Sequence, residues 1–192
     1  MFLEIGPVLI GIGVVLALII IIFVIWYIST GNTLRRLEQS VEEAESGIDV
    51  ALAKRYDSLT KMLDTTKGYA KHEAETLENT IKWRNGLPKS ATMAEKQEFA
   101  GQLAQVEKGL SVVVEQYPQL KADTVFAKLQ SAIMDSEEHL QAARRLYNSN
   151  VKNINNKIVS FPSSWVAKKI NMAKKEYFEV EEAKRQDVKM EF

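Results

Sequence analysis

The sequence predicts an all-α protein in which an N-terminal transmembrane helix is followed by an antiparallel helical bundle of three long helices and a short fourth. Three observations support this fold class. Residues 5–28 form an apolar run without a charge. From residue 33 onward, apolar side chains recur every three or four positions, which is the period of one helix face. Proline, at 4 of 192 residues, is too scarce to interrupt long helices.

The first element is the span at residues 5–28, which has 24 residues. As a helix it would extend about 36 Å, which exceeds the roughly 30 Å hydrocarbon core of a bilayer. Trp26 and Tyr27 lie near its end, where interfacial aromatic side chains concentrate. Residues 1–4 carry no lysine or arginine, so the segment lacks the basic start of a signal peptide and we expect an uncleaved anchor.

The charges at the two ends of the span predict its orientation. Glu4 precedes the span, whereas Arg35 and Arg36 follow it. Positively charged flanks tend to stay on the cytoplasmic side of a membrane. We therefore expect a single-pass protein of the inner or plasma membrane, with the short N-terminus at residues 1–4 outside and the C-terminal domain in the cytoplasm.

A helical bundle domain is predicted over residues 29–173. A polar break at residues 29–32 separates it from the span, and its first helix carries an apolar stripe that starts at Leu34. We expect this helix to end near Arg84, because the residues that follow have strong turn chemistry: Asn85-Gly86-Leu87-Pro88.

The later helices have recognisable ends. Thr92 and Glu95 have the spacing of a capping box, which starts the second helix, and Pro118 stops it. Asp123 is the expected N-cap of the third helix, which Pro162 ends. The connections are short, and short connections predict antiparallel neighbours.

The end of the chain is expected to be less regular. Ser163 or Ser164 is the expected cap of a short fourth helix. Residues 174–192 are charged and show little periodicity. We expect them to form a flexible tail.

Helix lengths predict a face without a partner inside the chain. The first helix is expected to cover about 52 residues and the second about 24, so a second helix that folds straight back reaches only the level of Leu59. The stretch before that level carries apolar side chains that favour burial, namely Leu34, Leu37, Val41, Ala44 and Ile48. They would pair with a second copy of the chain or with another protein. Alternatively, the first helix bends near Gly47, or the fourth helix and the tail cover them.

Composition excludes several classes of function. Lysine plus arginine and aspartate plus glutamate balance at 25 each, so no overall field attracts nucleic acid. The absence of cysteine excludes disulfides and cysteine-ligated metals. The sequence contains no nucleophile elbow and no glycine-rich phosphate loop. We therefore expect no enzymatic activity, no cofactor and no nucleic-acid partner.

His72 and Glu73 are the first candidate site residues, because neighbouring histidine and carboxylate side chains can bind a metal. A helical zinc site needs two histidines four positions apart, but the other histidine, His139, is on a different predicted helix. A pair of Glu73 with Glu137 across the core is the remaining arrangement. We favour solvated charges or a histidine–glutamate hydrogen bond over a metal site.

The second candidate group is polar and lies on one side of the third helix. Its members are Arg144, Tyr147, Asn148 and Asn155. The favoured interpretation is a satisfied polar layer that sets helix register, with Arg144 facing a carboxylate such as Glu73. The alternative is a recognition surface for a partner helix.

Several ordered blocks behind the span resemble the LemA family of bacterial membrane proteins. The blocks are Val41-Glu42-Glu43-Ala44, Lys54-Arg55-Tyr56-Asp57, and residues 67–73, 115–122, 143–148 and 161–163. LemA proteins usually have a proline-containing stretch after the second block, where residues 58–63 of this chain have none, so the first helix should be straighter here. The resemblance implies a small extracytoplasmic N-terminus, a cytoplasmic helical domain and no established enzymatic activity.

Taken together, these features predict a membrane-anchored, non-enzymatic helical scaffold or adaptor. Its partners would be the lipid bilayer and other proteins, including a second copy of itself. The alternative is a membrane-tethered sensor that binds a small ligand or ion in the bundle. A ligand would raise the melting temperature of a sensor, whereas an adaptor would co-purify with a partner protein.

Overall fold

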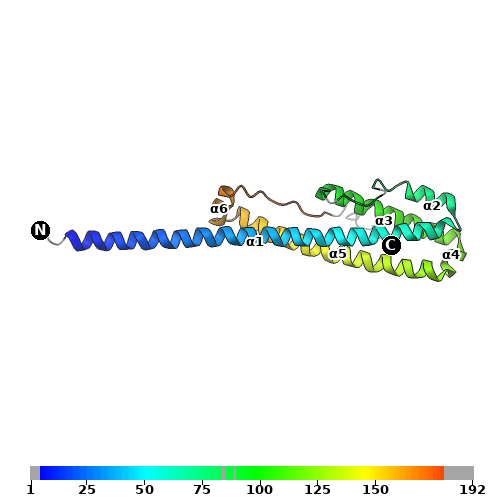
Figure 1. The fold of residues 1–192 in the computed structure, drawn as a ribbon, viewed down its shortest axis with the longest axis horizontal. Coiled ribbons are helices and arrows are strands. Elements are labelled where there is room, and N and C mark those ends of the chain that lie inside the picture. Colours follow the sequence, from blue (N-terminus) through cyan, green and yellow to red (C-terminus); the bar gives the residue numbers. More distant parts are fainter. Residues whose placement is uncertain (1–4, 84, 89, 180–192) are drawn as a thin grey trace, which may run out of the picture. The chain divides into compact units, whose positions relative to one another are not determined.

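The computed structural model of the chain describes residues 5–83, 85–88 and 90–179, and within these ranges every regular element is a helix (Figure 1). The helices are α1 Ile5–Lys67, α2 Lys71–Glu78, α3 Met93–Gln116, α4 Pro118–Ala122, α5 Thr124–Val159 and α6 Ser163–Lys169. The all-α prediction is confirmed.

The chain divides into two compact units, and α1 and α5 contribute to both. Unit 1 comprises residues 1–41 and 150–175, and unit 2 comprises residues 42–149 and 176–192.

The apolar N-terminal half of α1 lies in unit 1. Of the described residues, α1 is the one helix long and apolar enough to cross a membrane, with an apolar window of mean hydropathy 3.0 that no other part of the chain buries. The predicted polar break at residues 29–32 is absent, because the helix continues through it. The Thr33 hydroxyl donates to the Ser29 carbonyl at 2.9 Å, so this polar side chain is satisfied within the helix.

The end of α1 corrects the predicted length of the first helix. It ends at Lys67, not near Arg84, and a separate short helix, α2, follows after Gly68. A turn closes the helix here, in which the Gly68 N–H donates to the Thr65 carbonyl at 3.3 Å and the Ala70 N–H donates to the Thr66 carbonyl at 2.8 Å. The predicted turn further on is confirmed, since Gly86 has φ +80° and its N–H donates to the Trp83 carbonyl at 3.1 Å.

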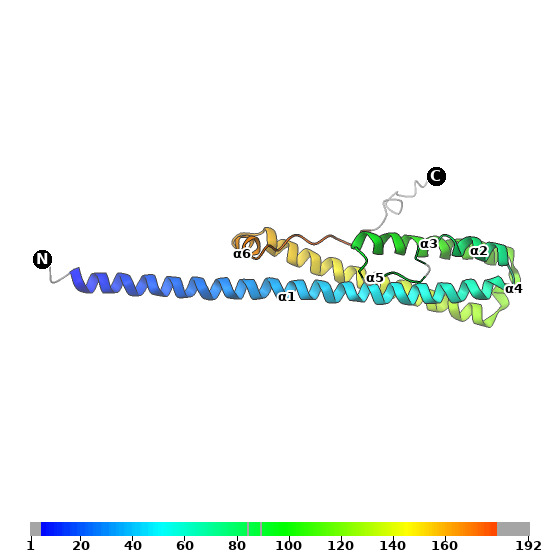
Figure 2. The ribbon, with the colours of Figure 1, turned by 45° about the horizontal axis from the view of Figure 1, so that its top comes forward.

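The direction of α3 in unit 2 differs from the prediction. Near its start, Lys96 contacts Glu45 and Asp49 of α1, and further along, Glu107 contacts Arg55 of α1. Both helices therefore run the same way (Figure 2). The chain returns along α2 and residues 79–92 before α3 begins. In contrast, α5 runs antiparallel to α1 in unit 2, because Glu137 contacts Arg55 while Ala143, further along α5, lies beside Gly47. The consecutive helices α3 and α5 are antiparallel, as predicted, but three helices of alternating direction would place α5 parallel to α1, so that direction also differs from the prediction.

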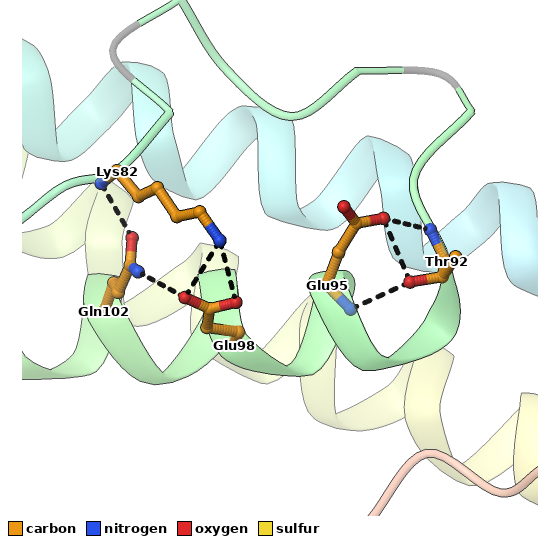
Figure 3. A network of polar contacts seen from close by, with 5 residues as sticks. All are labelled: Lys82, Thr92, Glu95, Glu98 and Gln102. Carbon is orange, nitrogen blue, oxygen red and sulfur yellow. Dashed lines mark hydrogen bonds and ion pairs between the residues drawn. The ribbon is translucent and has the colours of Figure 1, made fainter.

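Hydrogen bonds hold the connection between α2 and α3 against α3 (Figure 3). The Lys82 N–H donates to Gln102 Oε1 at 2.9 Å, and Lys82 Nζ lies 3.3 Å from Glu98 Oε2. At the start of α3 the predicted capping box is confirmed. The Glu95 N–H donates to the Thr92 hydroxyl oxygen at 3.3 Å, and the Thr92 N–H donates to the Glu95 carboxylate at 2.7 Å.

The apolar face predicted to need an external partner is covered by the chain itself. Four side chains of this face are buried, with exposed fractions between 0% and 4%: Leu34, Val41, Ala44 and Ile48. Leu37 is half-buried. In unit 1, Leu34 packs with Val166 and Ala167 of α6. The predicted alternative, in which the fourth helix covers this face, is therefore correct in unit 1. In unit 2, the start of α3 lies beside Glu45, because the chain has already turned back along α1 before α3 begins. The prediction that the second helix reaches back only to the level of Leu59 is therefore wrong.

The core of unit 2 combines side chains from five helices and the C-terminal segment. Its fully buried large members are Ile48, Leu52, Leu59, Leu63, Phe99, Leu103, Leu110, Leu120, Phe126 and Leu140. Phe178 is also buried, with 3% of its surface exposed. Burial of this apolar surface supplies the main stabilisation of the unit, at about 25 cal/mol per Å².

The starts of α5 and α6 give one confirmation and one correction. Asp123 accepts hydrogen bonds from the N–H groups of Val125 at 2.7 Å and Phe126 at 3.2 Å, as its predicted capping role requires. The predicted serine cap of the fourth helix is absent. Instead, the Ser163 hydroxyl turns back and donates to the carbonyl of Lys157 at 2.7 Å.

Replacing Thr92 by alanine removes the side-chain acceptor of the capping box. We expect the free energy of unfolding to fall by about 1 kcal/mol. Chemical denaturation of the full-length protein in detergent micelles, followed by circular dichroism, measures this change. The Thr92→Ser variant keeps the hydroxyl and should retain most of the stability. Equal stability of the alanine variant and the wild type would contradict the role of the cap.

Candidate functional site

Arg55 of α1 is buried in unit 2 and connects three long helices. Its exposed fraction is 4%. Nη2 lies 2.6 Å from Glu107 Oε2 of α3, and Nη1 lies 2.6 Å from Glu137 Oε2 of α5. Its Nε has no hydrogen-bond acceptor among the residues that the structure describes. A buried cation between two carboxylates fixes how the three helices are aligned, because sliding one helix would leave a charge without a partner.

Lys96 of α3 forms a second buried cation site in unit 2. Its Nζ lies 2.8 Å from Glu45 Oε1 and 2.7 Å from Asp49 Oδ1, both on α1. Burial by itself would lower the pKa of Lys96, but the hydrogen bonds with Asp49 and Glu45 outweigh it, so the pKa is raised. The lysine is therefore charged and holds the start of α3 against α1.

The roles of the two buried cations were not predicted from the sequence, although the sequence carries a signal for both. Arg55 lies three residues after Leu52 and four before Leu59, which places it on the apolar stripe of α1. Lys96 lies three residues before Phe99 on the stripe of α3. A cation on an apolar stripe needs buried carboxylate partners.

In unit 2, Tyr147 and Asn148 of α5 bind the C-terminal segment of the chain. The Tyr147 hydroxyl donates to the Glu176 carbonyl at 2.8 Å. Asn148 Nδ2 donates to the Phe178 carbonyl at 2.9 Å, and the Phe178 N–H donates to Asn148 Oδ1 at 2.8 Å. Burial, together with the charge of Glu45 and Glu176, raises the pKa of Tyr147 to about 12, so the phenol stays a donor at neutral pH.

Arg144 takes part in the same arrangement, in a way that differs from its predicted role. Its guanidinium lies 4.8 Å from the centre of the Phe178 ring, a cation–π contact, and it does not face Glu73. Burial lowers the pKa of Arg144, yet an arginine keeps its charge in proteins. Glu73 instead accepts a hydrogen bond from the Tyr117 hydroxyl at 2.9 Å.

In unit 1, Asn155 of α5 binds Lys175 in the way that Asn148 binds Phe178. Asn155 Nδ2 donates to the Lys175 carbonyl at 2.9 Å, and the Lys175 N–H donates to Asn155 Oδ1 at 2.9 Å. Lys175 Nζ also lies 2.8 Å from Glu38 of α1. This residue of the C-terminal segment is therefore fixed through both its backbone and its side chain.

Each of the two asparagines binds the backbone of one residue through both its amide nitrogen and its amide oxygen, within its own unit. The polar residues of α5 therefore bind the chain's own backbone. Residues 174–179 differ from the predicted flexible tail, and residues 180–192 lie outside the described part.

The candidate metal residues do not come together. His72 is exposed on α2, and Glu73 is bound to Tyr117, whereas Glu137 is paired with Arg55. The backbone N–H of Glu73 and the Tyr117 hydroxyl both lower the pKa of the Glu73 carboxyl group. Among the described residues, no group of three or more histidine and acidic side chains is placed to hold a metal ion.

Unit 2 has an open groove between α3 and α5, with α1 and the start of α4 contributing to it. The groove has a volume of about 710 Å³. Its lining residues are Met62, Glu107, Leu110, Ser111, Val114, Glu115, Pro118, Phe126, Gln130, Ile133 and Met134. Leu110, Phe126 and Ile133 are buried, while Met134 at its edge is 63% exposed. An exposed methionine beside an apolar floor is typical of surfaces that bind other proteins.

The fold and this groove define a class of protein: a helical bundle that carries an N-terminal helix able to cross a membrane. Comparison with family profiles matches residues 44–192 to the LemA family. The chain is also 31% identical over 168 residues to Protein LemA of Metamycoplasma hominis, which covers 87% of this chain and 77% of that protein. The chain belongs to the LemA family.

Replacing Arg55 by methionine should lower the free energy of unfolding by about 2 kcal/mol. The reason is that Glu107 and Glu137 lose their cation, although both are about a third exposed and regain some water. Denaturation of the full-length protein in detergent measures the change. Lys54→Met removes the same charge from an exposed neighbouring position and should have little effect. Equal losses for both variants would contradict a specific role of Arg55.

Replacing Asn148 by alanine should release the backbone of Phe178. We expect exchange of the Phe178 amide hydrogen to become at least about fivefold faster, because a buried hydrogen bond is lost. Hydrogen exchange with mass spectrometry of the full-length protein reports it. Ser149→Ala, at the exposed neighbouring position, is the matched control. Unchanged exchange in the Asn148 variant would show that the asparagine does not hold the segment.

Proposed function

We propose that this chain is a membrane-anchored helical adaptor whose α3–α5 groove binds an amphipathic helix of a partner protein. Residues 5–28 cross the cell membrane, with the N-terminus outside and the rest of the chain in the cytoplasm. The chain acts through contacts and not through catalysis. The observation that carries the proposal is the open groove of unit 2, with its apolar floor.

The dimensions of the groove suit a helix. Its α3 wall runs from Glu107 to Glu115 and its α5 wall from Phe126 to Met134, which is eight residue-to-residue steps in each case. Eight residues of helix rise are about 12 Å, or slightly more than two turns. An amphipathic helix inserts side chains at positions i, i+3, i+4 and i+7 into such a groove, a span of similar length.

The charges around the groove favour a basic partner. Glu107 and Glu115 line it, and among the described residues no lysine or arginine does. Glu107 already faces Arg55, so the exposed carboxylate of Glu115 is the main free charge. A partner helix with lysine or arginine beside its apolar face would complement this edge, which gives orientation and specificity more than affinity.

Anchoring explains how a groove of modest size can be effective. Confining two proteins to one membrane raises their effective concentration, so a weak contact becomes occupied. The cations that follow the span support the proposed orientation, because positive flanks favour the cytoplasmic side. These cations include Arg35 and Arg36.

A photo-reactive amino acid at Gln130 tests the proposal in native membranes. We expect an adduct whose site in the partner maps to an amphipathic helix with flanking lysine or arginine. Met134→Glu should lower the adduct yield roughly tenfold or more, because it places a carboxylate against the apolar face. Leu146→Glu, at an α5 position that is 57% exposed and outside the groove, should leave the yield unchanged.

Two results would contradict the adaptor proposal. One is an adduct yield from Gln130 that Met134→Glu does not lower. The other is the absence of any protein adduct together with a rise in melting temperature on adding a small ligand, a rise that Met134→Glu removes. The second result would assign the groove to a sensor.

A further inference from the structure

We propose that the corner between α5 and α6 in unit 1 docks on the membrane surface and binds the headgroups of anionic phospholipids. The inference rests on the membrane-anchoring part of the proposed function and is independent of the α3–α5 groove. It concerns residues 157–169 and the part of α1 beside them.

The position of Trp165 places this corner at the level of the membrane. Its ring centre lies 5.9 Å from that of Phe23 and 5.9 Å from that of Tyr27, with the Tyr27 contact edge-on. Phe23 belongs to the apolar run at residues 5–28, so a side chain that touches it lies at the edge of the bilayer when that run spans the membrane. In Figures 1 and 2, α6 lies beside α1 in both views. Tryptophan and tyrosine concentrate at this interface.

The corner exposes a large apolar side chain at the same level. Phe161, between α5 and α6, is 88% exposed, and Val159 just before it is 53% exposed. An aromatic side chain exposed to this extent is unfavourable in water but suits insertion among lipid headgroups. Because Phe161 is four residues before Trp165 in the chain, both can enter the same interface.

Charge supports an anionic partner. Residues 150–175 contain six lysines and no aspartate or glutamate, although the whole chain has a net charge of zero. Within the described residues, Lys157, Lys168 and Lys169 form no ion pair, whereas Lys175 is bound to Glu38. Lysines held next to a membrane surface attract anionic lipids.

An open pocket lined by both polar and apolar side chains supplies a place for a headgroup. It has a volume of about 670 Å³ and lies between α1 and the end of α5. Its lining includes Ser29, Thr30, Asn156, Lys157 and Ser160, and Trp26 at the end of the span also contributes. Hydroxyl, amide and ammonium groups are donors that suit phosphate oxygens. The position of Trp26 allows the acyl chains to follow the exposed apolar side of α1.

A spin label at the corner tests the docking in the full-length chain. The sequence has no cysteine, so Ser160→Cys gives a single label beside Phe161. In nanodiscs of phosphatidylcholine with phosphatidylglycerol, we expect the label to be accessible to oxygen and shielded from a water-soluble nickel complex. In phosphatidylcholine alone it should be accessible to the nickel complex. A label at Val125→Cys, an exposed position in unit 2, should be water-accessible in both.

Charge variants complete the test. The triple change Lys157→Gln, Lys168→Gln and Lys169→Gln should lower the ratio of docked to undocked corner roughly a hundredfold, at about fivefold per lysine. The triple change Lys54→Gln, Lys61→Gln and Lys128→Gln removes the same charge elsewhere and should have no effect. A Ser160 label that is water-accessible in phosphatidylglycerol discs would overturn the proposal. The proposal would also be overturned if the Ser160 label were equally shielded in phosphatidylcholine alone. Equal shielding in the triple variant of Lys157, Lys168 and Lys169 would overturn it too.

Failure of residues 5–28 to enter the membrane gives a different result from failure of the corner to dock. A chain that does not enter nanodiscs at all would overturn both the anchoring and the docking. A chain that enters discs but keeps its corner in water would overturn the docking alone, and the adaptor groove would be unaffected by that result.

Discussion

The bridge from Arg55 to Glu107 and Glu137 is the interaction on which the rest of unit 2 depends. One buried guanidinium connects α1, α3 and α5 at contact distance. Apolar packing alone tolerates small slips along a helix, whereas a buried charge does not. Lys96 repeats the constraint at the start of α3. With α3 and α5 fixed to α1 in this way, the groove between them keeps its shape.

A second property of the molecule is that it covers its own amphipathic surfaces. The α1 face that the sequence left without a partner is buried inside each unit. The polar side of α5, which also resembled a recognition surface, holds the backbone of Lys175 and Phe178. Two surfaces of the described residues remain open to other molecules: the apolar groove of unit 2, and the aromatic and basic corner of unit 1. We propose a protein helix as the occupant of the first and lipid headgroups as the occupant of the second.

Much of the fold could be predicted because its signals are local. The capping box at Thr92 and the cap at Asp123 depend on neighbouring residues, and both were correct. The end of α1 at Lys67 was missed because the apolar spacing continues past it, and Gly68 is no distinct signal, since α1 runs through Gly31 and Gly47. That error reversed the predicted direction of α3. The roles of Arg55 and Asn148 depend on partners more than 25 residues away, which no local pattern specifies.

The direction of α3 along α1 is the central claim, because the groove and the cover of α1 both follow from it. Carbodiimide crosslinking of the full-length protein, with a mixture of isotope-labelled and unlabelled chains, tests it directly. The 2.8 Å and 2.7 Å contacts predict zero-length links from Lys96 to Glu45 or Asp49 within one chain. Links from Lys96 to Asp64, near the other end of α1, would mean that the helix folds straight back and would contradict this arrangement.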